Sequence, residues 1–446
     1  MSVLLHKKKR RLTSFQTIVL GYAGVILIGA LVLMLPVSSK SGSFTPFNEA
    51  LFTSTSAVCV TGLVVQDTAT YWSVFGQSII LLLIQIGGLG VIMVAAAFAL
   101  LSGRKITLMQ RSTMQEAIAA PKVGGIVRLT RFALRATMLI EFLGAALMMP
   151  TFIKDFGAKG IWMSFFHSVS AFCNSGFDIM GSDSAKYSSL TSYIGNPVIN
   201  ITVILLIVIG GIGFLTWEDI CINKFRFRRY RMQSKVILVT TAFLIAVPAL
   251  FLFFSDFSDM PVKEKVFSSL FQAVTPRTAG FNTADLQTMS GAGKAILIAL
   301  MLIGGSPGST AGGMKTTTFS VLLCNAASIF RRRKDTQMFG RRIDDGTVKN
   351  ASTIFITYLV LFFGGAIIIS TSEGLPFGTC LYETASAIGT VGLSLGITPG
   401  LGMPSQCVLM MLMFFGRVGG LTLIYAAISG TGKKLSKLPQ EKIIVG

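Results

Sequence analysis

Long runs of apolar residues dominate this sequence and restrict the folds open to it. Most of them approach the roughly 20 residues that an α-helix needs to cross the hydrocarbon core of a membrane. Only 13% of the 446 residues are charged, compared with about 25% in soluble domains. We therefore expect an all-α integral membrane protein. The clearest runs are Phe15–Val37, Ile79–Leu101, Val198–Leu215, Val236–Phe254, Ile354–Ser370 and Val408–Ile428, and Leu134–Phe152 and Ala295–Ile303 are weaker candidates.

The net charge of +20 comes largely from Lys and Arg clusters between the apolar runs. This placement indicates membrane topology and argues against a nucleic-acid partner. Basic loops between apolar helices remain on the cytoplasmic side and attract anionic membrane lipid. Both termini and three internal connections should therefore be cytoplasmic, which leaves four excursions across the membrane and eight spanning helices. The basic segments are Lys7–Arg11, Arg104–Arg135, Lys224–Lys235, Lys315–Lys349 and Lys433–Lys442.

Each excursion contains a second, shorter segment that ends in small residues with one glycine. These glycines, Gly62, Gly176, Gly280 and Gly392, are 104 to 114 residues apart. A near-constant period of this size indicates a repeated structural unit, whereas ordinary outer loops would not recur in this way. We predict four pseudo-repeats around one central pore, each with a helix, a re-entrant pore helix, a filter loop and a second helix. The short segments are Pro46–Leu63, Gly160–Phe177, Val262–Phe281, whose ending is the longest, and Pro376–Leu393.

The predicted organisation joins these repeats through basic connections. A glycine-rich motif such as Gly87-Gly88-Leu89-Gly90 recurs within the last helix of each repeat, and we interpret it as close helix packing. The repeats cover residues 15–102, 126–222, 235–330 and 350–430, the cytoplasmic connections cover 103–125, 223–234 and 331–349, and the cytoplasmic termini are 1–14 and 431–446.

The four endings have the composition of an ion filter. Non-helical backbone at membrane depth persists only where protein buries it or where it lines a water-filled cavity. Rings of backbone carbonyls replace the hydration shell of potassium, and glycine reaches the dihedral angles that this geometry requires. Thr390-Val391-Gly392 matches the start of the potassium-channel signature Thr-Val-Gly-Tyr-Gly. We predict that backbone carbonyls bind K⁺ in a filter made of Val60, Thr61, Gly62, Asn174, Ser175, Gly176, Thr278, Ala279, Gly280, Thr390, Val391 and Gly392.

The last helix of the third repeat is interrupted at mid-membrane by glycines and Pro307, which do not support a continuous helix. We interpret the interruption as a gate that plugs the pore, with few side chains to anchor it, and a kinked helix is the alternative. A phosphate-binding loop is not expected, because Met314 breaks the motif before Lys315. The segment reads Gly304, Gly305, Ser306, Pro307, Gly308, Ser309, Thr310, Ala311, Gly312 and Gly313.

Arg417 places a charge in the middle of an apolar helix, where a charge is costly and usually faces a cavity or a partner. We interpret it as part of the gate, a fixed positive charge under the filter that is braced against the plug. A structural Arg paired with carbonyls is the alternative. Arg277, in the third loop, is interpreted as a loop brace on the outer side, and Glu383 as a brace for the fourth loop.

These motifs resemble the Trk/Ktr/HKT superfamily of potassium transporters over residues 15–430, and the layout resembles the Ktr-type membrane subunit. The superfamily has an intramembrane gating loop and an Arg at the places of Gly304–Gly313 and Arg417. Plant sodium-selective members often carry Ser at the place of Gly62, so glycine there favours potassium. The resemblance implies a homodimer in the bacterial cell membrane, with one pore per chain and a cytosolic nucleotide-binding regulatory ring of the KtrA type. It implies no cofactor in this chain, K⁺ as the transported ion and Na⁺ as a candidate activator.

Three classes of function compete at this point. The first is a potassium-translocating subunit of a gated uptake system with channel-like permeation. The alternative is a sodium- or proton-coupled potassium carrier, a class that often combines inverted repeats with acidic residues at the midplane. Here all repeats begin on one side, and the predicted pore axis shows no obvious acidic cluster. An enzyme is not expected, because only His6 and His167 are present and no nucleophile–base arrangement is visible.

Overall fold

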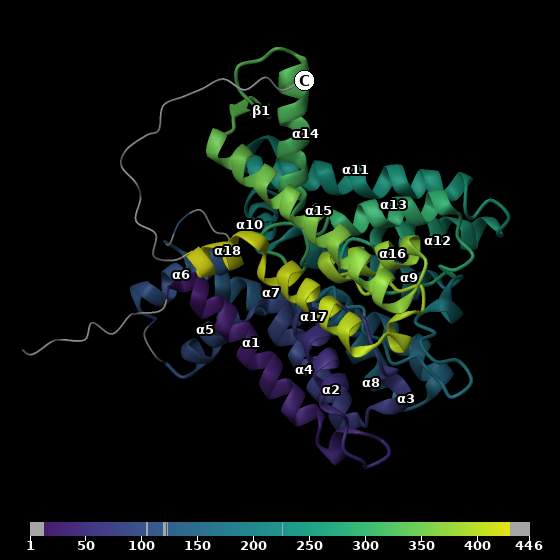
Figure 1. The fold of residues 1–446 in the computed structure, drawn as a ribbon. Coiled ribbons are helices and arrows are strands. Elements are labelled where there is room, and N and C mark those ends of the chain that lie inside the picture. The colour runs from purple at the N-terminus through teal and green to yellow at the C-terminus, as the bar shows by residue number, and fades with distance from the viewer. Residues whose placement is uncertain (1–12, 104–105, 119–121, 123, 225, 429–446) are drawn as a thin grey trace, which may run out of the picture.

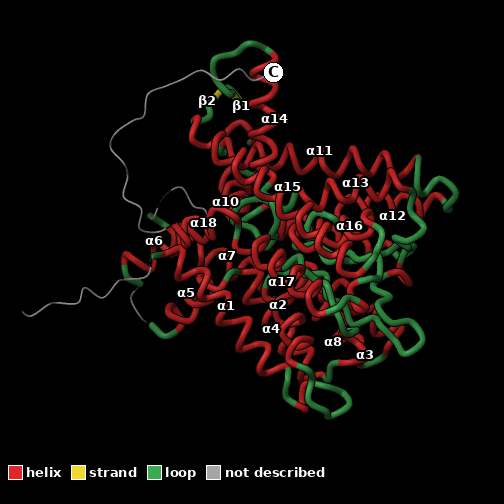
Figure 2. The backbone as a smooth tube through the Cα atoms, viewed as in Figure 1, coloured by secondary structure: helices red, strands yellow, loops and turns green. Residues whose placement is uncertain are grey.

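The computed structural model describes residues 13–103, 106–118, 122, 124–224 and 226–428, so the basic clusters Lys7–Arg11 and Lys433–Lys442 lie outside the described residues. The described chain is mostly helical, with loops between the helices and almost no strand (Figure 2), which confirms the all-α prediction. Its helices are α1 (Ser14–Leu33), α2 (Phe47–Val58), α3 (Thr68–Tyr71), α4 (Val74–Leu89), α5 (Val91–Leu101), α6 (Leu108–Ile118), α7 (Ile126–Phe156), α8 (Lys159–Phe172), α9 (Pro197–Ile212), α10 (Phe214–Asn223), α11 (Met232–Phe254), α12 (Val262–Val274), α13 (Gly291–Leu302), α14 (Thr316–Phe330), α15 (Asp345–Glu373), α16 (Phe377–Gly389), α17 (Met403–Val418) and α18 (Gly420–Ile428). Strands β1 (Gln337–Met338) and β2 (Arg341–Arg342) form one antiparallel hairpin.

Four of the described helices, α1, α7, α11 and α15, are long and apolar enough to cross a membrane alone. Two bent pairs qualify only when each is taken as one span: α4 with α5, bent by 95°, and α9 with α10, bent by 98°. Helices α13, α14 and α17 are apolar but shorter. By length and composition, the described residues therefore supply four spans, or up to six with the bent pairs, where the sequence predicted eight.

The bends correct the interpretation of the glycine-rich motif. We expected these glycines to lie within continuous helices, but the helices end immediately before Gly90, Gly213 and Gly419. The three glycines have φ of +88°, +91° and +90°, values that a residue with a Cβ rarely adopts. Glycine is therefore required here because the chain changes direction.

Other glycines of the same motif do pack closely, as predicted. A Cβ added to Gly87, Gly210 or Gly416 would overlap a backbone carbonyl oxygen. In each case this oxygen belongs to the C-terminal turn of a short helix: Val58 in α2, Phe172 in α8 and Ile388 in α16. The motif therefore lets the ends of the short helices approach the backbone of the following helix.

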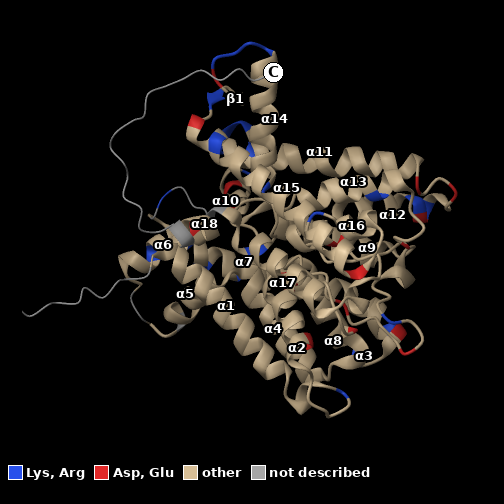
Figure 3. Cartoon of the chain, viewed as in Figure 1, with Lys and Arg blue, Asp and Glu red and all other residues tan. Residues whose placement is uncertain are grey.

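Each of four short helices packs on a long helix, and many of the Lys and Arg residues gather on one extension of the structure. Helix α2 packs on α1, α8 on α7, α12 on α11 and α16 on α15. Helix α14, the β-hairpin and the start of α15 extend beyond the other helices (Figure 1), and Lys and Arg gather on this extension (Figure 3). A small separate core joins the extension to α11: Val236, Val321, Met338, Ile343 and Ala351.

Candidate functional site

The short helices α2, α8, α12 and α16 end in buried sequence at the centre of the molecule. Three of them begin directly after a proline: Pro46, Pro261 and Pro376. Their C-terminal turns are enclosed by protein, since every residue from Phe52 to Val58 and from Tyr382 to Gly389 is buried. The unpaired carbonyls at a helix C-terminus carry partial negative charge. The four ends therefore provide an environment that favours a cation.

The chain leaves each short helix through the same backbone conformation. A residue with left-handed backbone is followed, two positions later, by a glycine that also has positive φ. Since a Cβ disfavours this region, the non-glycine members hold backbone strain that their surroundings must maintain. The pairs are Val60 and Gly62, Asn174 and Gly176, Thr278 and Gly280, and Thr390 and Gly392, with φ between +51° and +96°.

The four loops close into a ring, which we call the glycine ring. Each glycine contacts the residue that precedes the glycine of the next loop. A Cβ added to the first glycine would collide with the carbonyl oxygen of that residue. These contacts run from Gly62 to Ser175, from Gly176 to Ala279, from Gly280 to Val391 and from Gly392 to Thr61. Eight of the twelve predicted filter residues therefore meet around one axis.

The other four predicted filter residues are Val60, Asn174, Thr278 and Thr390, and all of them are buried. Thr390 lies against Gly312, and Asn174 lies 3.3 Å from the Cβ position of Gly211. Thr390 thus faces the segment Gly304–Gly313, and Asn174 faces the end of α9. The structure therefore brings the predicted filter and the predicted gate into contact.

Four hydroxyl groups that the sequence analysis did not single out brace the ring. The hydroxyls of Ser56 and Ser386 accept hydrogen bonds from the N–H groups of Gly62 (3.1 Å) and Gly392 (3.0 Å). In the other two repeats the direction is reversed, because the hydroxyl donates to the carbonyl that follows the glycine. These bonds join Ser170 to Phe177 (2.7 Å) and Thr275 to Phe281 (2.6 Å).

The third ending is the longest, as expected: six residues separate the end of α12 at Val274 from Gly280, compared with four between the end of α2 at Val58 and Gly62. Its brace also differs in position. Thr275 is five residues before Gly280, whereas the bracing Ser of each other repeat is six residues before its glycine. The third loop is therefore one residue shorter between its brace and its glycine.

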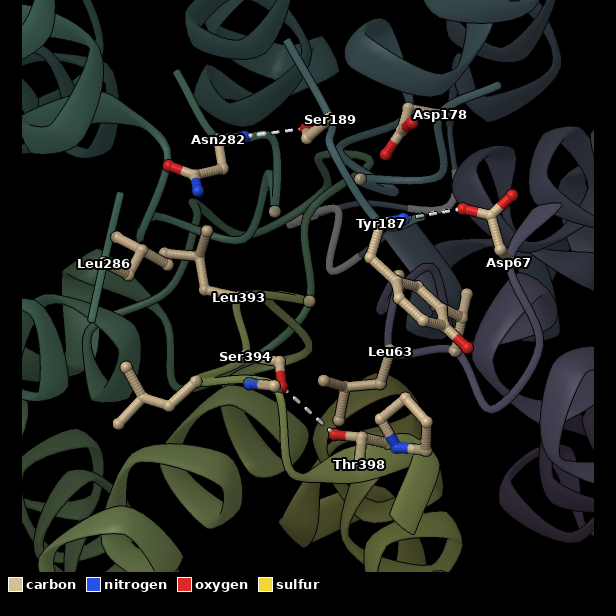
Figure 4. A pocket seen from close by; sticks show the side chains of 18 of the residues that line it. Leu63, Asp67, Asp178, Tyr187, Ser189, Asn282, Leu286, Leu393, Ser394 and Thr398 are labelled. Carbon is tan, nitrogen blue, oxygen red and sulfur yellow. Dashed lines mark hydrogen bonds between the residues drawn. The ribbon is translucent and has the colours of Figure 1, made fainter. Parts of the chain in front are cut away.

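A cavity of about 350 Å³ lies on one side of the glycine ring and is lined by all four of its glycines (Figure 4). Asp67, Asp178 and Asp285 also line it. Asp67 accepts hydrogen bonds from the N–H groups of Tyr187 and Thr70, both at 2.8 Å. Burial raises the pKa of Asp178 to about 7, and the nearby Asp67 carboxylate acts in the same direction. The sequence analysis found no obvious acidic cluster on the pore axis. The sequence does contain a signal for one, because in three loops an Asp follows the glycine within five residues.

The segment Gly304–Gly313 forms irregular backbone between α13 and α14, and it is bonded to the second repeat. Its polar backbone groups pair with groups that the α9–α10 break leaves free. The hydrogen bonds run from Ser306 N to Gly211 O (3.0 Å), from Thr310 N to Gly210 O (3.3 Å) and from Phe214 N to Gly308 O (2.7 Å). We expected few side chains to anchor this segment, and backbone groups supply these anchors.

The same segment also contacts the ends of two short helices. The Thr310 hydroxyl donates to Phe172 O at the end of α8, at 3.0 Å. The N–H of Gly313 donates to Gly416 O in α17, at 3.1 Å, and Gly313 lies beside the carbonyl of Gly389 at the end of α16. The segment is thus directly beneath the glycine ring, on the side opposite the cavity.

Arg417, in the last turn of α17, connects three repeats. Its guanidinium donates to the carbonyl oxygens of Thr310, Gly87 and Gly88, the last at 2.9 Å. The salt bridges of the described residues do not include Arg417. Carbonyl dipoles therefore hold this charge, and the third, first and fourth repeats meet at it.

Two other charged residues were assigned as braces. The guanidinium of Arg277 donates to the hydroxyl of Thr241 in the middle of α11 (3.3 Å), so it ties the third loop to this helix. Glu383 accepts hydrogen bonds from Ser394 and Leu395 at 2.5 and 3.0 Å. Glu383 therefore braces the chain directly after the fourth filter loop, as predicted.

Comparison with known proteins settles the family. The TrkH family model, described as cation transport protein, matches residues 3–437. The chain belongs to the TrkH family. It is 37% identical to the potassium/sodium uptake protein NtpJ of Enterococcus hirae, with 100% of both chains covered. It is 36% identical to Ktr system potassium uptake protein B of Bacillus subtilis, over 98% of this chain and 97% of that one.

A solved structure supports the fold independently. The potassium transporter TrkH from Vibrio parahaemolyticus aligns with a TM-score of 0.71 at 19% identity, over 94% of this chain and 86% of that chain. The resemblance found from sequence motifs is thus confirmed. As a TrkH-family member with several apolar helices, the protein is a multi-pass membrane protein, and its family transports cations rather than catalysing a reaction.

Gly62→Ser should lower the ratio of potassium to sodium uptake by about fivefold or more, which corresponds to about 1 kcal/mol. The added Cβ would be strained at φ +91° and would displace the Ser175 carbonyl. Uptake of both ions in a transport-deficient strain measures the ratio. Gly42→Ser is the matched control, because Gly42 also has positive φ (+68°) but nothing lies within 4 Å of its Cβ position. An unchanged ratio in normally expressed Gly62→Ser would remove the glycine ring from the ion path.

Ser386→Ala should reduce the same ratio about two- to fivefold, because a buried hydrogen bond contributes roughly 1 kcal/mol and this one positions Gly392. Ser164→Ala removes an equally buried hydroxyl from a short helix, but that hydroxyl donates to Gly160 within α8 and does not reach the ring. We expect this control to leave selectivity unchanged. Equal effects of the two substitutions would show that the brace has no special role.

Proposed function

We propose that this chain is the potassium-translocating membrane subunit of a gated uptake system, and that ions pass through the glycine ring. The closed order of contacts among Gly62, Gly176, Gly280 and Gly392 carries the proposal. Carbonyl rings of this kind replace the hydration shell of K⁺. The printed functions of the related E. hirae and B. subtilis proteins, potassium/sodium and potassium uptake, support the same cargo.

Negative charge in the cavity and partial negative charge at the ends of the short helices both favour a cation at the ring. Asp67 and Asp285, together with Asp178 when it is ionised, lower the potential in the cavity that leads to the ring. The C-terminal ends of the short helices do the same from behind the loops. Because the four loops differ in sequence and each holds one ring glycine, we expect fewer well-formed sites than in a channel with four identical loops.

The gate in this proposal is the segment Gly304–Gly313 together with Arg417. The segment lies beneath the ring, and opening must break the bonds of Arg417 to Thr310, Gly87 and Gly88. Moving a two-state gate from 1:99 to 99:1 needs about 5.5 kcal/mol of differential binding. This is comparable to a few hydrogen bonds at roughly 0.5–1.5 kcal/mol each.

A cytosolic regulatory ring of the KtrA type, bound to a homodimer of this chain, would supply that energy. Helix α14 begins three residues after Gly313 and leads directly to the basic β-hairpin. Force applied to the hairpin would therefore reach the gate through one helix. In this arrangement the hairpin faces the cytoplasm, consistent with the positive-inside rule.

Reversal potentials of the purified chain in liposomes test the function. With a potassium gradient alone, a passive pore should reverse at the potassium equilibrium potential, and added sodium or pH gradients should not shift it. A shift that follows the sodium or proton gradient would instead establish the coupled carrier. Measuring flux with and without sodium at fixed potential tests whether Na⁺ is an activator.

Arg417→Gln should raise potassium flux into the same liposomes several-fold, because it frees the gate segment and removes a positive charge beside the ion path. Arg231→Gln is the control, since Arg231 is an Arg that pairs with Glu218 and Asp219 at the start of α11, away from the gate. A folded Arg417→Gln protein with unchanged or reduced flux would contradict the gate assignment and make Arg417 a structural residue.

A further inference from the structure

Three arginines form a cationic groove on the surface of α7, away from the glycine ring. Arg128, Arg131 and Arg135 are spaced by three and four residues, which places them on one face of the helix, and all three are exposed. With Phe132, Ala136 and Leu139 they line a shallow groove of about 500 Å³. We call it the α7 groove.

The positive charge of this groove has no counter-charge within the described chain. The salt bridges of the described residues involve Arg231 and Arg342, and none of them reaches the groove. Three adjacent guanidinium groups repel one another unless an anion or salt screens them. The groove is therefore complementary to an anion that comes from outside the chain.

The same face of α7 continues as an exposed apolar stripe. Its residues are Met138, Leu139, Phe142, Leu143 and Leu147, between 51% and 69% exposed. From Arg135 to Leu147 the helix rises about 18 Å, close to the roughly 15 Å of one leaflet of the hydrocarbon core. A ligand that covers both parts needs an anionic head and a long apolar tail.

We propose that the α7 groove binds an anionic glycerophospholipid, with its phosphate between the three arginines and an acyl chain along the apolar stripe. Arginine suits this role because its planar guanidinium binds phosphate oxygens through two parallel N–H donors. A soluble anion would leave the stripe uncovered, and a zwitterionic lipid would leave charge unbalanced. Helix α7 packs directly on the short helix α8, so the lipid would lie behind the second filter loop.

Native mass spectrometry of the purified full chain in detergent tests the site. The ligands are dioleoyl-phosphatidylglycerol, dioleoyl-phosphatidylcholine and soluble glycerol phosphate, which separates the lipid from its free headgroup. The variants are R128Q/R131Q/R135Q and the control R331Q/R332Q/R333Q, which removes the same charge from exposed arginines beside the β-hairpin. We expect wild type and control to prefer phosphatidylglycerol over phosphatidylcholine at least about tenfold, and the α7 variant to prefer it less than about threefold.

A measurement on wild type keeps the proposal testable if the α7 variant does not fold. Photoactivatable phosphatidylglycerol with its reactive group on the acyl chain should label the peptide that contains Met138–Leu147. Absence of that label overturns the proposal, and so does displacement of the lipid by glycerol phosphate at similar concentration. Loss of an oligomer in the α7 variant, with lipid preference unchanged, would make this face an interface between copies of the chain and would equally overturn it.

Discussion

The structure depends on one requirement: backbone N–H and C=O groups away from water must find partners inside the protein. Helices meet it by themselves, but besides the bends at Gly90, Gly213 and Gly419, five segments of the described chain leave the helical path near the centre of the molecule. Four are the loops that we propose as the filter, and each is braced by a hydroxyl such as Ser56 or Thr275. The fifth, Gly304–Gly313, takes its partners from the α9–α10 break and from Arg417. Irregular backbone is therefore completed by hydroxyls of the same repeat in the four loops and by groups of other repeats in Gly304–Gly313.

This dependence couples the loops of the proposed filter to the proposed gate segment. The carbonyl of Phe172 ends a short helix and also accepts a hydrogen bond from Thr310. Thr390 belongs to the fourth filter loop and also packs against Gly312. A movement of the gate segment must consequently change contacts made by at least two of the four loops. If the proposed roles hold, conduction and selectivity share these contacts.

Much of this could be predicted from sequence because apolar length and glycine spacing are local signals. The period of Gly62, Gly176, Gly280 and Gly392 anticipated loops that the structure brings together, and the cluster at Pro307 anticipated a broken helix. The bends at Gly90 and Gly213 were missed, because a glycine that permits close packing and one that permits positive φ look identical in sequence. The braces were missed for a related reason: a Ser in a helix shows its bond only when the loop returns to it, and in the third repeat that return is one residue shorter.

Chain connectivity has a consequence for symmetry that emerges from the place of Gly304–Gly313. In our proposal this segment blocks the axis around which four loops are arranged, and an axis has room for one such segment. Four identical subunits would bring four copies of it to the same point. Joining the repeats in one polypeptide removes this conflict, because a single repeat can diverge while the other three keep the ring. A single chain of four different repeats can therefore carry one asymmetric segment of this kind, whereas a homotetramer of identical subunits cannot.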